Sequence, residues 1–462
     1  MDTSIHNPDS KSSGGIFTRL KKAADGGYVD QLACDHAFEQ MHRQDSIGDR
    51  IHLILACLGL MVFFGPVTVS ELAFAPLVVF FAVRIVNTFP VWIHGFGQPI
   101  VLAVIVLMGW MMLSLLWSGD HPHGWSEIGE LRWFLFIGFF FPIIEHRVVL
   151  IRALCIGLAI GQLGQVADAF NGFGIGWLES LVVNHPGRIG GWWHPVVGGT
   201  MLVGGLGLHL PAALFGTGRA RIFGILGSGM ISLGILATGS RGAWIASVLL
   251  VLFCVGFGLI ARWIRWKRVF LIAAIGSVVL GAGAFTIREG LQSRINETKV
   301  ELNEIMDGQY DSYTGKRIRM GKVAIEGIKE HPIIGVGAGS FQHWGNEHDP
   351  DQGIFAHAHN GLLHIWSTLG LVGVLVWSVV LGIMLRSAWR FREVDRAQIS
   401  DHIYSVGPFF AICGLMLATI TDVVHINTQS AAMLGILAGL SPSICPGHRD
   451  WSGIEQGRQA DN

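Results

Sequence analysis

Long apolar runs constrain this chain more than any other feature of its sequence. From residue 51 nearly to the C-terminus, mostly apolar runs recur, and about 20 apolar residues let a helix cross roughly 30 Å of hydrocarbon. Hydrophobic residues make up 51% of the 462 residues and charged residues only 14%, with a mean hydropathy of +0.50. Soluble domains carry about 25% charged residues. The sequence therefore predicts an all-α, polytopic integral membrane protein.

We expect about twelve transmembrane helices, since each apolar run ends at a polar or glycine-rich connection. The fourth and fifth are the least distinct, because they are crowded around Glu145, His146 and Arg147, and the last is short. The predicted ranges are 51–69, 72–89, 98–117, 131–146, 147–166, 196–216, 221–237, 242–261, 268–286, 361–385, 405–420 and 427–441.

Lys and Arg gather in the connections on one side of the membrane. They occur in the first 50 residues and in the segments "TGRAR", "ARWIRWKR" and "RSAWRFREVDR". The positive-inside rule makes this side cytoplasmic. Residues 1–50 have no apolar core of a signal peptide, so we expect a cytoplasmic tail there, a transmembrane domain over 51–445 and a second cytoplasmic tail over 446–462.

The longest connection, residues 287–360, falls on the outer side. Within it apolar residues recur at helical spacing while basic residues occupy the rest of the helical wheel. This pattern is typical of an amphipathic helix on a membrane surface, and Pro332 ends it. The apolar positions are Ile318, Gly321, Ile325 and Ile328, and the basic positions are Lys316, Arg317, Arg319, Lys322 and Lys329.

Three polar segments share this outer side in the predicted topology. They are "NHPGRIGGWWHP" (184–195), "TGSRGAW" (238–244) and the end of the long loop, "HAHN". We therefore expect three arginines from separate connections to converge with two histidines near one membrane surface. These residues are Arg188, Arg241, Arg317, His357 and His359.

Each arginine has a structural alternative. Arg241 follows Gly239 and the hydroxyls of Thr238 and Ser240 at a helix N-terminus, where exposed N–H groups favour an anion. A positive side chain there opposes the helix dipole, so we expect it to hold a ligand rather than to act as an interfacial anchor.

The other candidates are more ambiguous. Arg188 can be structural, and Arg317 and Arg319 can lie on the solvated face of the amphipathic helix. The glycine run "GVGAGS" (335–340) suits either a phosphate nest or a turn.

Histidines are dense in the second half of the long loop. His343, His348, His357, His359 and His364 fall close together, yet neither HExxH nor spaced Cys and His pairs occur. The six cysteines are scattered and read as packing residues. We therefore favour acid–base chemistry over a metal site or interfacial packing, and expect no cofactor.

The residues that close the long loop carry a resemblance. His359 and Asn360, then nine residues, then Gly370 and Gly373 resemble the signature of the O-antigen ligase and O-antigen polymerase superfamily. "TGSRGAW", "RIGGWWHP" and "KRIRMGKVAIEGIKEHPIIGVGAGSF" are similar to other recurrent segments of that family. The resemblance covers roughly residues 180–385.

This resemblance implies a GT-C-like glycosyltransferase on the periplasmic face of a bacterial inner membrane. The donor would be a glycan on undecaprenyl diphosphate, and the acceptor a sugar hydroxyl of lipid A–core or of another glycan. His359 would be the base, and Arg241 and Arg317 would hold the diphosphate, with Arg319 as a rival. Further candidates for substrate binding are Arg188, Ser240, Asn360 and His357.

The residue types suit this chemistry. A diphosphate leaving group is matched by guanidinium forks, and no nucleic acid is implied as a partner. A polymerase of O-antigen or exopolysaccharide units is the alternative function, and a protein O-glycosyltransferase is less favoured. A transporter needs ionisable groups near the bilayer middle, whereas Arg84, Arg152, Asp168 and Asp422 fall near predicted helix ends.

Overall fold

The structure is a computed structural model that describes residues 31–171, 188–286, 288–348, 356–394 and 403–442. The predicted tail 446–462, residues 1–30 of the N-terminal tail and residues 184–187 of the first polar segment lie outside this part. The described residues form helices, turns and loops, with no β-sheet among them. The predicted all-α class is confirmed.

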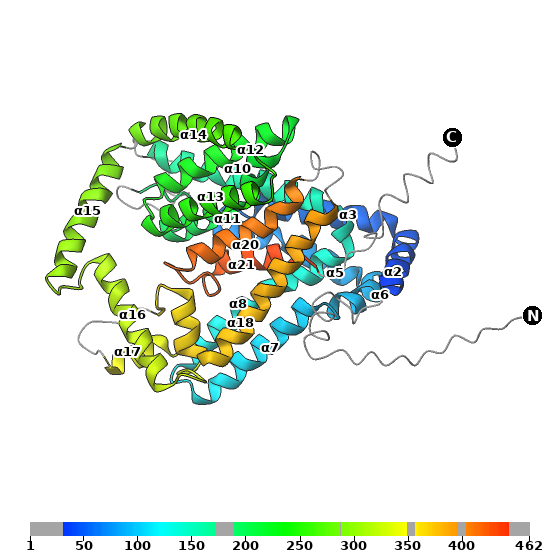
Figure 1. The fold of residues 1–462 in the computed structure, drawn as a ribbon. Helices are drawn as coiled ribbons and strands as arrows, with labels where there is room; N and C mark the ends of the chain where they lie inside the picture. The colour runs from blue at the N-terminus through cyan, green and yellow to red at the C-terminus, as the bar shows by residue number, and fades with distance from the viewer. Residues whose placement is uncertain (1–30, 172–187, 287, 349–355, 395–402, 443–462) are drawn as a thin grey trace, which may run out of the picture.

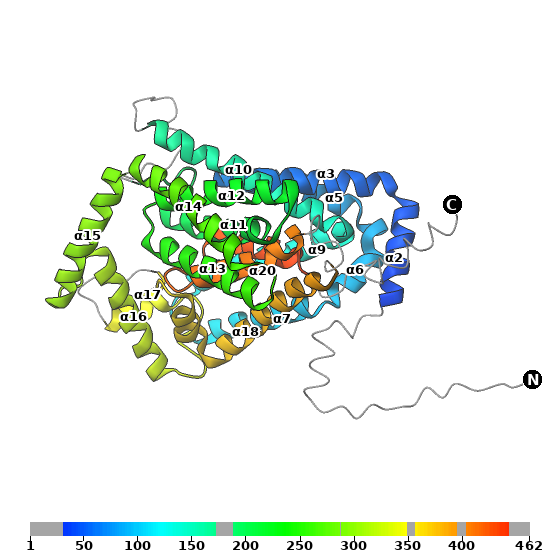
Figure 2. The ribbon, with the colours of Figure 1, turned by 45° about the horizontal axis from the view of Figure 1, so that its top comes forward.

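Most helices run side by side in one elongated bundle, and α15, α16 and α17 lie at one end of it (Figures 1 and 2). The α-helices are α2 (Gln31–Gln44), α3 (Ser46–Val62), α4 (Val67–Ala73), α5 (Ala75–Val83), α6 (Ile85–Phe96), α7 (Pro99–Ser114), α8 (His121–Glu130), α9 (Phe136–Phe140), α10 (Arg147–Asn171), α11 (Pro195–Phe215), α12 (Gly218–Ala237), α13 (Arg241–Ile260), α14 (Trp266–Thr286), α15 (Arg288–Met306), α16 (Tyr313–Glu330), α17 (Phe341–His348), α18 (Gly361–Val394), α20 (Gly407–Ala418) and α21 (Thr428–Gly439). Short 3₁₀ helices occupy Leu115–Trp117, Leu131–Leu135, Phe141–His146 and Ile403–Val406.

Fewer helices among the described residues qualify as membrane spans than the sequence predicts. Within the described residues, six helices are long and apolar enough to cross a membrane, or seven if the bent pair Thr68–Val83 and Ile85–Phe96 counts as one span. The expectation of about twelve spans is therefore not confirmed. The multi-pass membrane class is supported.

Two predicted helices in the N-terminal half of the chain are broken. The predicted helix 72–89 is α5 and α6, which meet at Arg84, and the bent pair turns by 98° there. Arg84 is buried and donates to Asp45 (2.7 Å) and Asp49 (2.5 Å), so the break is fixed by an ion-paired cluster. The predicted helix 131–146 is three short pieces, because Pro142 lacks an N–H group and the backbone of Ile143 is not helical.

Residues 31–50 are not an unstructured tail. They form α2 and the start of α3. Phe38 on α2 is buried and packs edge-on against Phe141, with ring centroids 5.6 Å apart. The bundle therefore begins well before residue 51.

Helix α11 lies at the centre of the bundle and is buried along almost its whole length. Its glycines let neighbouring backbones approach, as is common between membrane helices. A Cβ atom on Gly207, for example, would lie 2.4 Å from the carbonyl oxygen of Phe410 on α20. This packing holds the loop before α11 next to the turn between α12 and α13.

Helix α16 has the predicted position but packs through a different face. Met320, Val323, Ala324 and Gly327 are buried, at the spacing i, i+3, i+4 and i+7 of one helical face. The expected apolar stripe is exposed instead: Ile318 is 39% and Ile325 44% exposed. The helix carries two apolar stripes, and the one with small residues fits against Val336, Phe341 and Ala358.

Candidate functional site

The turn between α12 and α13 presents Arg241 as the first residue of α13. Gly239 in this turn has φ +61°, a conformation that suits glycine. The hydroxyl of Thr238 accepts from the Ser240 N–H at 3.2 Å. Ser240 holds the N-cap position of α13 and is buried.

The guanidinium of Arg241 reaches away from its own helix to α15. Nη1 and Nη2 donate to the two carboxylate oxygens of Glu301 at 2.6 and 3.1 Å, and Nη1 also donates to Thr298 at 2.9 Å. Such two-point contacts orient a guanidinium firmly. Arg241 is therefore joined to a second element and is not a lone interfacial anchor.

Arg188 lies against the same turn. Its Nε donates to the carbonyl of Thr238 at 2.8 Å. A Cβ atom on Gly239 would lie 3.4 Å from Cγ of Arg188 and 3.7 Å from Cγ of Arg294, so these two side chains flank the glycine. Burial, followed by the charges of Arg294 and Arg317, lowers the pKa of Arg188 to about 10.

Arg294, on α15, is a site residue that the sequence did not reveal. It pairs with Glu297, and its Nε is buried without a hydrogen-bond partner among the described residues. Charged residues are frequent throughout α15 and no apolar pattern marks it as an element, so nothing in the sequence singles out this arginine.

Arg317 faces the other arginines from α16. Burial lowers its pKa most, Asp422 opposes this, and Arg241 lowers it further. Arg319 follows two residues later, about 200° around the helix, and so points to a different side. The geometry therefore favours Arg317 over its rival Arg319.

His357 and His359 lie in contact just before α18. Their ring centroids are 4.3 Å apart with an interplanar angle of 76°. Burial, followed by the charge of His364, lowers the pKa of His357 to about 4, and burial, His357 and Arg317 lower that of His359 to about 3. Both imidazoles are therefore neutral at ordinary pH and able to accept a proton.

The backbone of His359 is strained, with φ +51°. Among the described residues only Arg262 shares a positive φ without being glycine. Such strain costs about 1–3 kcal/mol and tends to cluster at functional sites.

Asn360 has a clear structural task. Its Oδ1 accepts from the N–H of Leu363 at 2.9 Å, and its Nδ2 donates to the carbonyl of Ile420 at 3.0 Å. The residue caps α18 and ties it to the connection before α21. Although Asn360 was expected to bind substrate, these two bonds favour a role in holding the neighbouring His359 in place.

Gly370 breaks α18 with φ +69°. A Cβ atom there would lie 2.1 Å from the carbonyl oxygen of Ile333. Residues 332–337 cover the break: the N–H of Leu371 donates to Pro332 and the N–H of Val336 donates to Ser367, both at 2.9 Å. The spacing between His359 and Gly370 thus sets the length of the first helical segment.

The glycine run 335–340 is a turn and not a phosphate nest. Its N–H groups already have protein acceptors: Gly337 donates to Thr368 (2.8 Å), Ala338 to Ser114 (3.1 Å) and Gly339 to Glu127 (3.1 Å). A nest requires such groups to point at a bound anion.

Two carboxylates, neither of them expected at this site, lie near the histidines. Buried Asp422 accepts from Thr200 at 3.3 Å, and its negative charge raises the pKa of His357. Glu127 lies 3.2 Å from Nε2 of buried His364. Both lie near helix ends, where a single carboxylate in the sequence cannot be told from one that faces solvent.

The five histidines from His343 to His364 do not form one cluster. His343 pairs with Glu347 on α17 at 3.3 Å, and His348 stacks on Trp344. Among the described residues, no group of three or more His, Cys, Asp or Glu side chains is placed to hold a metal ion.

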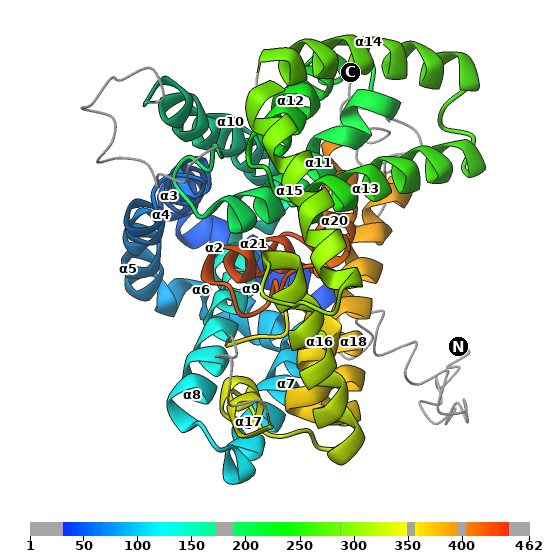
Figure 3. The same cartoon turned by 90° about the vertical axis from the view of Figure 1, so that its left-hand side faces the viewer.

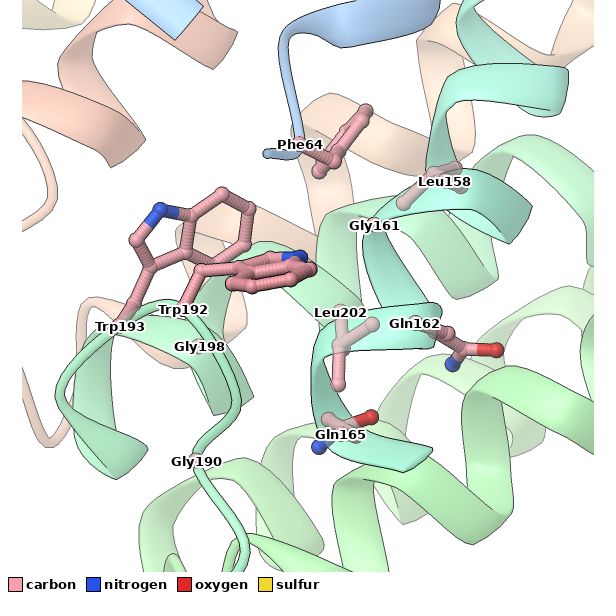
Figure 4. A pocket seen from close by; sticks show the side chains of 10 residues that line it. All are labelled: Phe64, Leu158, Gly161, Gln162, Gln165, Gly190, Trp192, Trp193, Gly198 and Leu202. Atoms are coloured by element: carbon pink, nitrogen blue, oxygen red, sulfur yellow. The ribbon is translucent and has the colours of Figure 1, made fainter. Parts of the chain in front are cut away.

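A small pocket lies beside the loop that carries Arg188 (Figure 4). Phe64, Trp192 and Trp193 line it, and its volume of about 20 Å³ holds roughly one water molecule. Gln165 donates to the carbonyls of Ile189 (3.2 Å) and Gly234 (3.0 Å). The first of these bonds ties the loop that follows Arg188 to α10.

The described residues define an all-helical membrane protein in which four arginines from α13, α15, α16 and the loop before α11 gather with two neutral histidines. Residues 226–378 match the O-antigen ligase family. That range covers about a third of the chain and includes Arg241, Arg294, Arg317, His357 and His359. Over these residues, the predicted resemblance to the O-antigen ligase and polymerase superfamily is confirmed. No curated protein matches the chain.

Proposed function

We propose that this protein transfers a glycan from undecaprenyl diphosphate to a sugar hydroxyl of lipid A–core, on the periplasmic face of a bacterial inner membrane. The observation that carries the proposal is the meeting of Arg188, Arg241 and Arg317 with the neutral His357 and His359 pair. The family match supports glycosyl transfer of the ligase or polymerase type.

In this mechanism His359 takes the proton of the acceptor hydroxyl as that oxygen attacks the anomeric carbon of the donor sugar. The bond between the anomeric carbon and the phosphate oxygen breaks, and its electron pair leaves with the diphosphate. Arg241 and Arg317 stabilise the negative charge that develops there. Removing one such donor typically costs about 10²- to 10³-fold in rate.

A polymerase that extends O-antigen or exopolysaccharide units is the second candidate. It would use the same leaving group and the same kind of attacking hydroxyl, so the arginine and histidine arrangement serves both reactions. The family match also includes this type of transfer at the level of the superfamily.

Complementation of a null strain tests the proposal. We expect His359→Ala and Arg241→Ala, at normal expression, to lose the full-length product on lipopolysaccharide gels. The matched controls are His343→Ala, whose side chain is 47% exposed on α17, and Arg319→Ala, and both should retain it. Full product from both site variants would overturn the catalytic assignment.

The null strain separates the two candidate reactions. A missing ligase leaves unligated long chains on the lipid carrier, whereas a missing polymerase leaves single repeat units on the core. The first result supports ligation, and the second supports polymerisation.

A further inference from the structure

A buried carboxylate occupies one edge of the Arg241 guanidinium. Glu301 on α15 is 4% exposed and accepts from Nη1 and Nη2 of Arg241 at 2.6 and 3.1 Å. Burial alone would raise the pKa of Glu301, but hydrogen bonds from Arg241 and Thr314 lower it below its usual range. Glu301 is therefore an ionised counter-ion inside the site.

The same carboxylate reaches a third helix. The hydroxyl of Thr314, in the first turn of α16, donates to Oε2 of Glu301 at 2.5 Å. Arg317 follows Thr314 by three residues, which is about one helical turn. Glu301 thus links Arg241 on α13 to the turn of α16 that carries Arg317.

Repulsion among the arginines explains why a counter-ion is needed. The charges of Arg294, Arg317 and Arg241 each lower the pKa of Arg188, after burial. The carboxylate of Glu301 acts in the opposite direction on Arg317 and raises its pKa. Without this negative charge, the site would have to hold closely spaced positive charges until the donor arrives.

The contacts on Arg241 leave its other edge available. A guanidinium has five N–H groups. Nη1 donates to Glu301 and Thr298, and Nη2 donates once to Glu301. Among the described residues this leaves the Nε–H and one Nη2–H, which together form the side-on edge suited to a two-point contact with phosphate oxygens.

We propose that Glu301 is a positioning residue, which fixes Arg241 and α16 so that the side-on edge of Arg241 and the guanidinium of Arg317 face one diphosphate. This inference rests on the proposed function and adds a residue to it. Glu301 does not touch the donor; it acts through Arg241 and Thr314.

Steady-state kinetics of the full-length protein test this role. We expect Glu301→Gln to raise KM for the undecaprenyl-diphosphate glycan about tenfold or more, because small misplacements of a binding group are costly. The KM for the acceptor should change less than about twofold. Glu301→Asp keeps the charge but withdraws it from Arg241, and should also raise the donor KM. Glu304→Gln, one turn along α15, is the control and should stay within about twofold of wild type.

Thermal unfolding separates positioning from simple stabilisation. The double variant Arg241→Glu with Glu301→Arg should regain the melting temperature that the single variants lose. It should not regain donor binding, which is measured with undecaprenyl diphosphate as the probe. An unchanged donor KM in folded Glu301→Asp would overturn the positioning role. A lowered donor KM would also overturn it, because it would mean that Glu301 competes with the diphosphate. Activity retained by Arg241→Ala would instead contradict the proposed function.

Discussion

His359 combines a strained backbone with a desolvated imidazole. Its φ of +51° is held by the cap that Asn360 places on α18 and by the bond from the N–H of Gly361 to Thr419 at 2.8 Å. Its ring contacts that of His357, and burial keeps it neutral. Both features suit the role of proton acceptor that we propose for this residue.

The low pKa of His359 predicts an unusual pH dependence. A base must be neutral to act, and an ordinary imidazole base with a pKa of about 6.5 loses about tenfold in activity per pH unit below that value. The pKa of His359 is lowered to about 3, so kcat/KM should stay nearly flat from about pH 7.5 to pH 5.

The kcat profile should fall in the same direction but at a higher pH. A bound diphosphate adds negative charge, which raises the pKa of a nearby base, so kcat should begin to fall at a higher pH than kcat/KM. Initial rates at varied donor concentration across the pH range measure both. A kcat/KM profile that bends near pH 6.5 would contradict the assignment of a buried His359 as the base.

At the scale of elements, the break in α18 is the feature that the sequence signature encodes. Gly370→Ala would add a Cβ atom 2.1 Å from the carbonyl oxygen of Ile333, at φ +69°. We expect a loss of stability of about 2 kcal/mol or more. The glycan product should also be lost, because the added Cβ atom would displace residues 332–337, which cover the break in α18.

The same helix supplies the control for that substitution. Gly382 in α18 has no atom within 4 Å of the position of an added Cβ atom, and Gly382→Ala should leave stability equal or slightly higher. Thermal unfolding of both variants in detergent provides the comparison. Equal melting temperatures would show that the break tolerates a side chain.

Elements with one uninterrupted apolar run could be predicted from the sequence almost to the residue. The predicted range 196–216 is α11 (Pro195–Phe215), and 242–261 is α13 (Arg241–Ile260). The breaks at Arg84 and Pro142 could not be predicted, because hydropathy averages over a window and does not register the single residue that interrupts a helix. Which of the two apolar stripes of α16 is buried likewise depends on the residues that pack against the helix, and the sequence of α16 alone does not show this.

The site was predictable to the extent that its residues sit in glycine-rich or signature segments. Arg188, Arg241, Arg317, His357 and His359 stand out in this way, and the structure places them together. Arg294 and Glu301 lie in a highly charged helix, where the composition does not distinguish them from the other charged residues. Their roles depend on which face of α15 meets α13, and that is a tertiary fact.

At the scale of the whole molecule, the arginines on α15 and α16 lie at one end of the bundle, and these two helices face the viewer in Figure 3. The bond between Glu301 and Arg241 puts the turn between α12 and α13 at this end. Helix α12 has 20 residues, which corresponds to about 30 Å. The turn between α11 and α12 therefore lies near the opposite end of the bundle, about one bilayer thickness away.

This separation makes membrane orientation testable with two cysteines. Asp307 lies in the exposed turn after α15, and Arg219 is an exposed residue in the first turn of α12. In a variant without the native cysteines, Asp307→Cys should react with a membrane-impermeant maleimide in intact spheroplasts, whereas Arg219→Cys should react only after lysis. The reason is the excess of Lys and Arg in the connections on the Arg219 side, which the positive-inside rule assigns to the cytoplasm. The reverse labelling pattern would place the arginines and His359 in the cytoplasm, where a periplasmic glycan transfer is impossible.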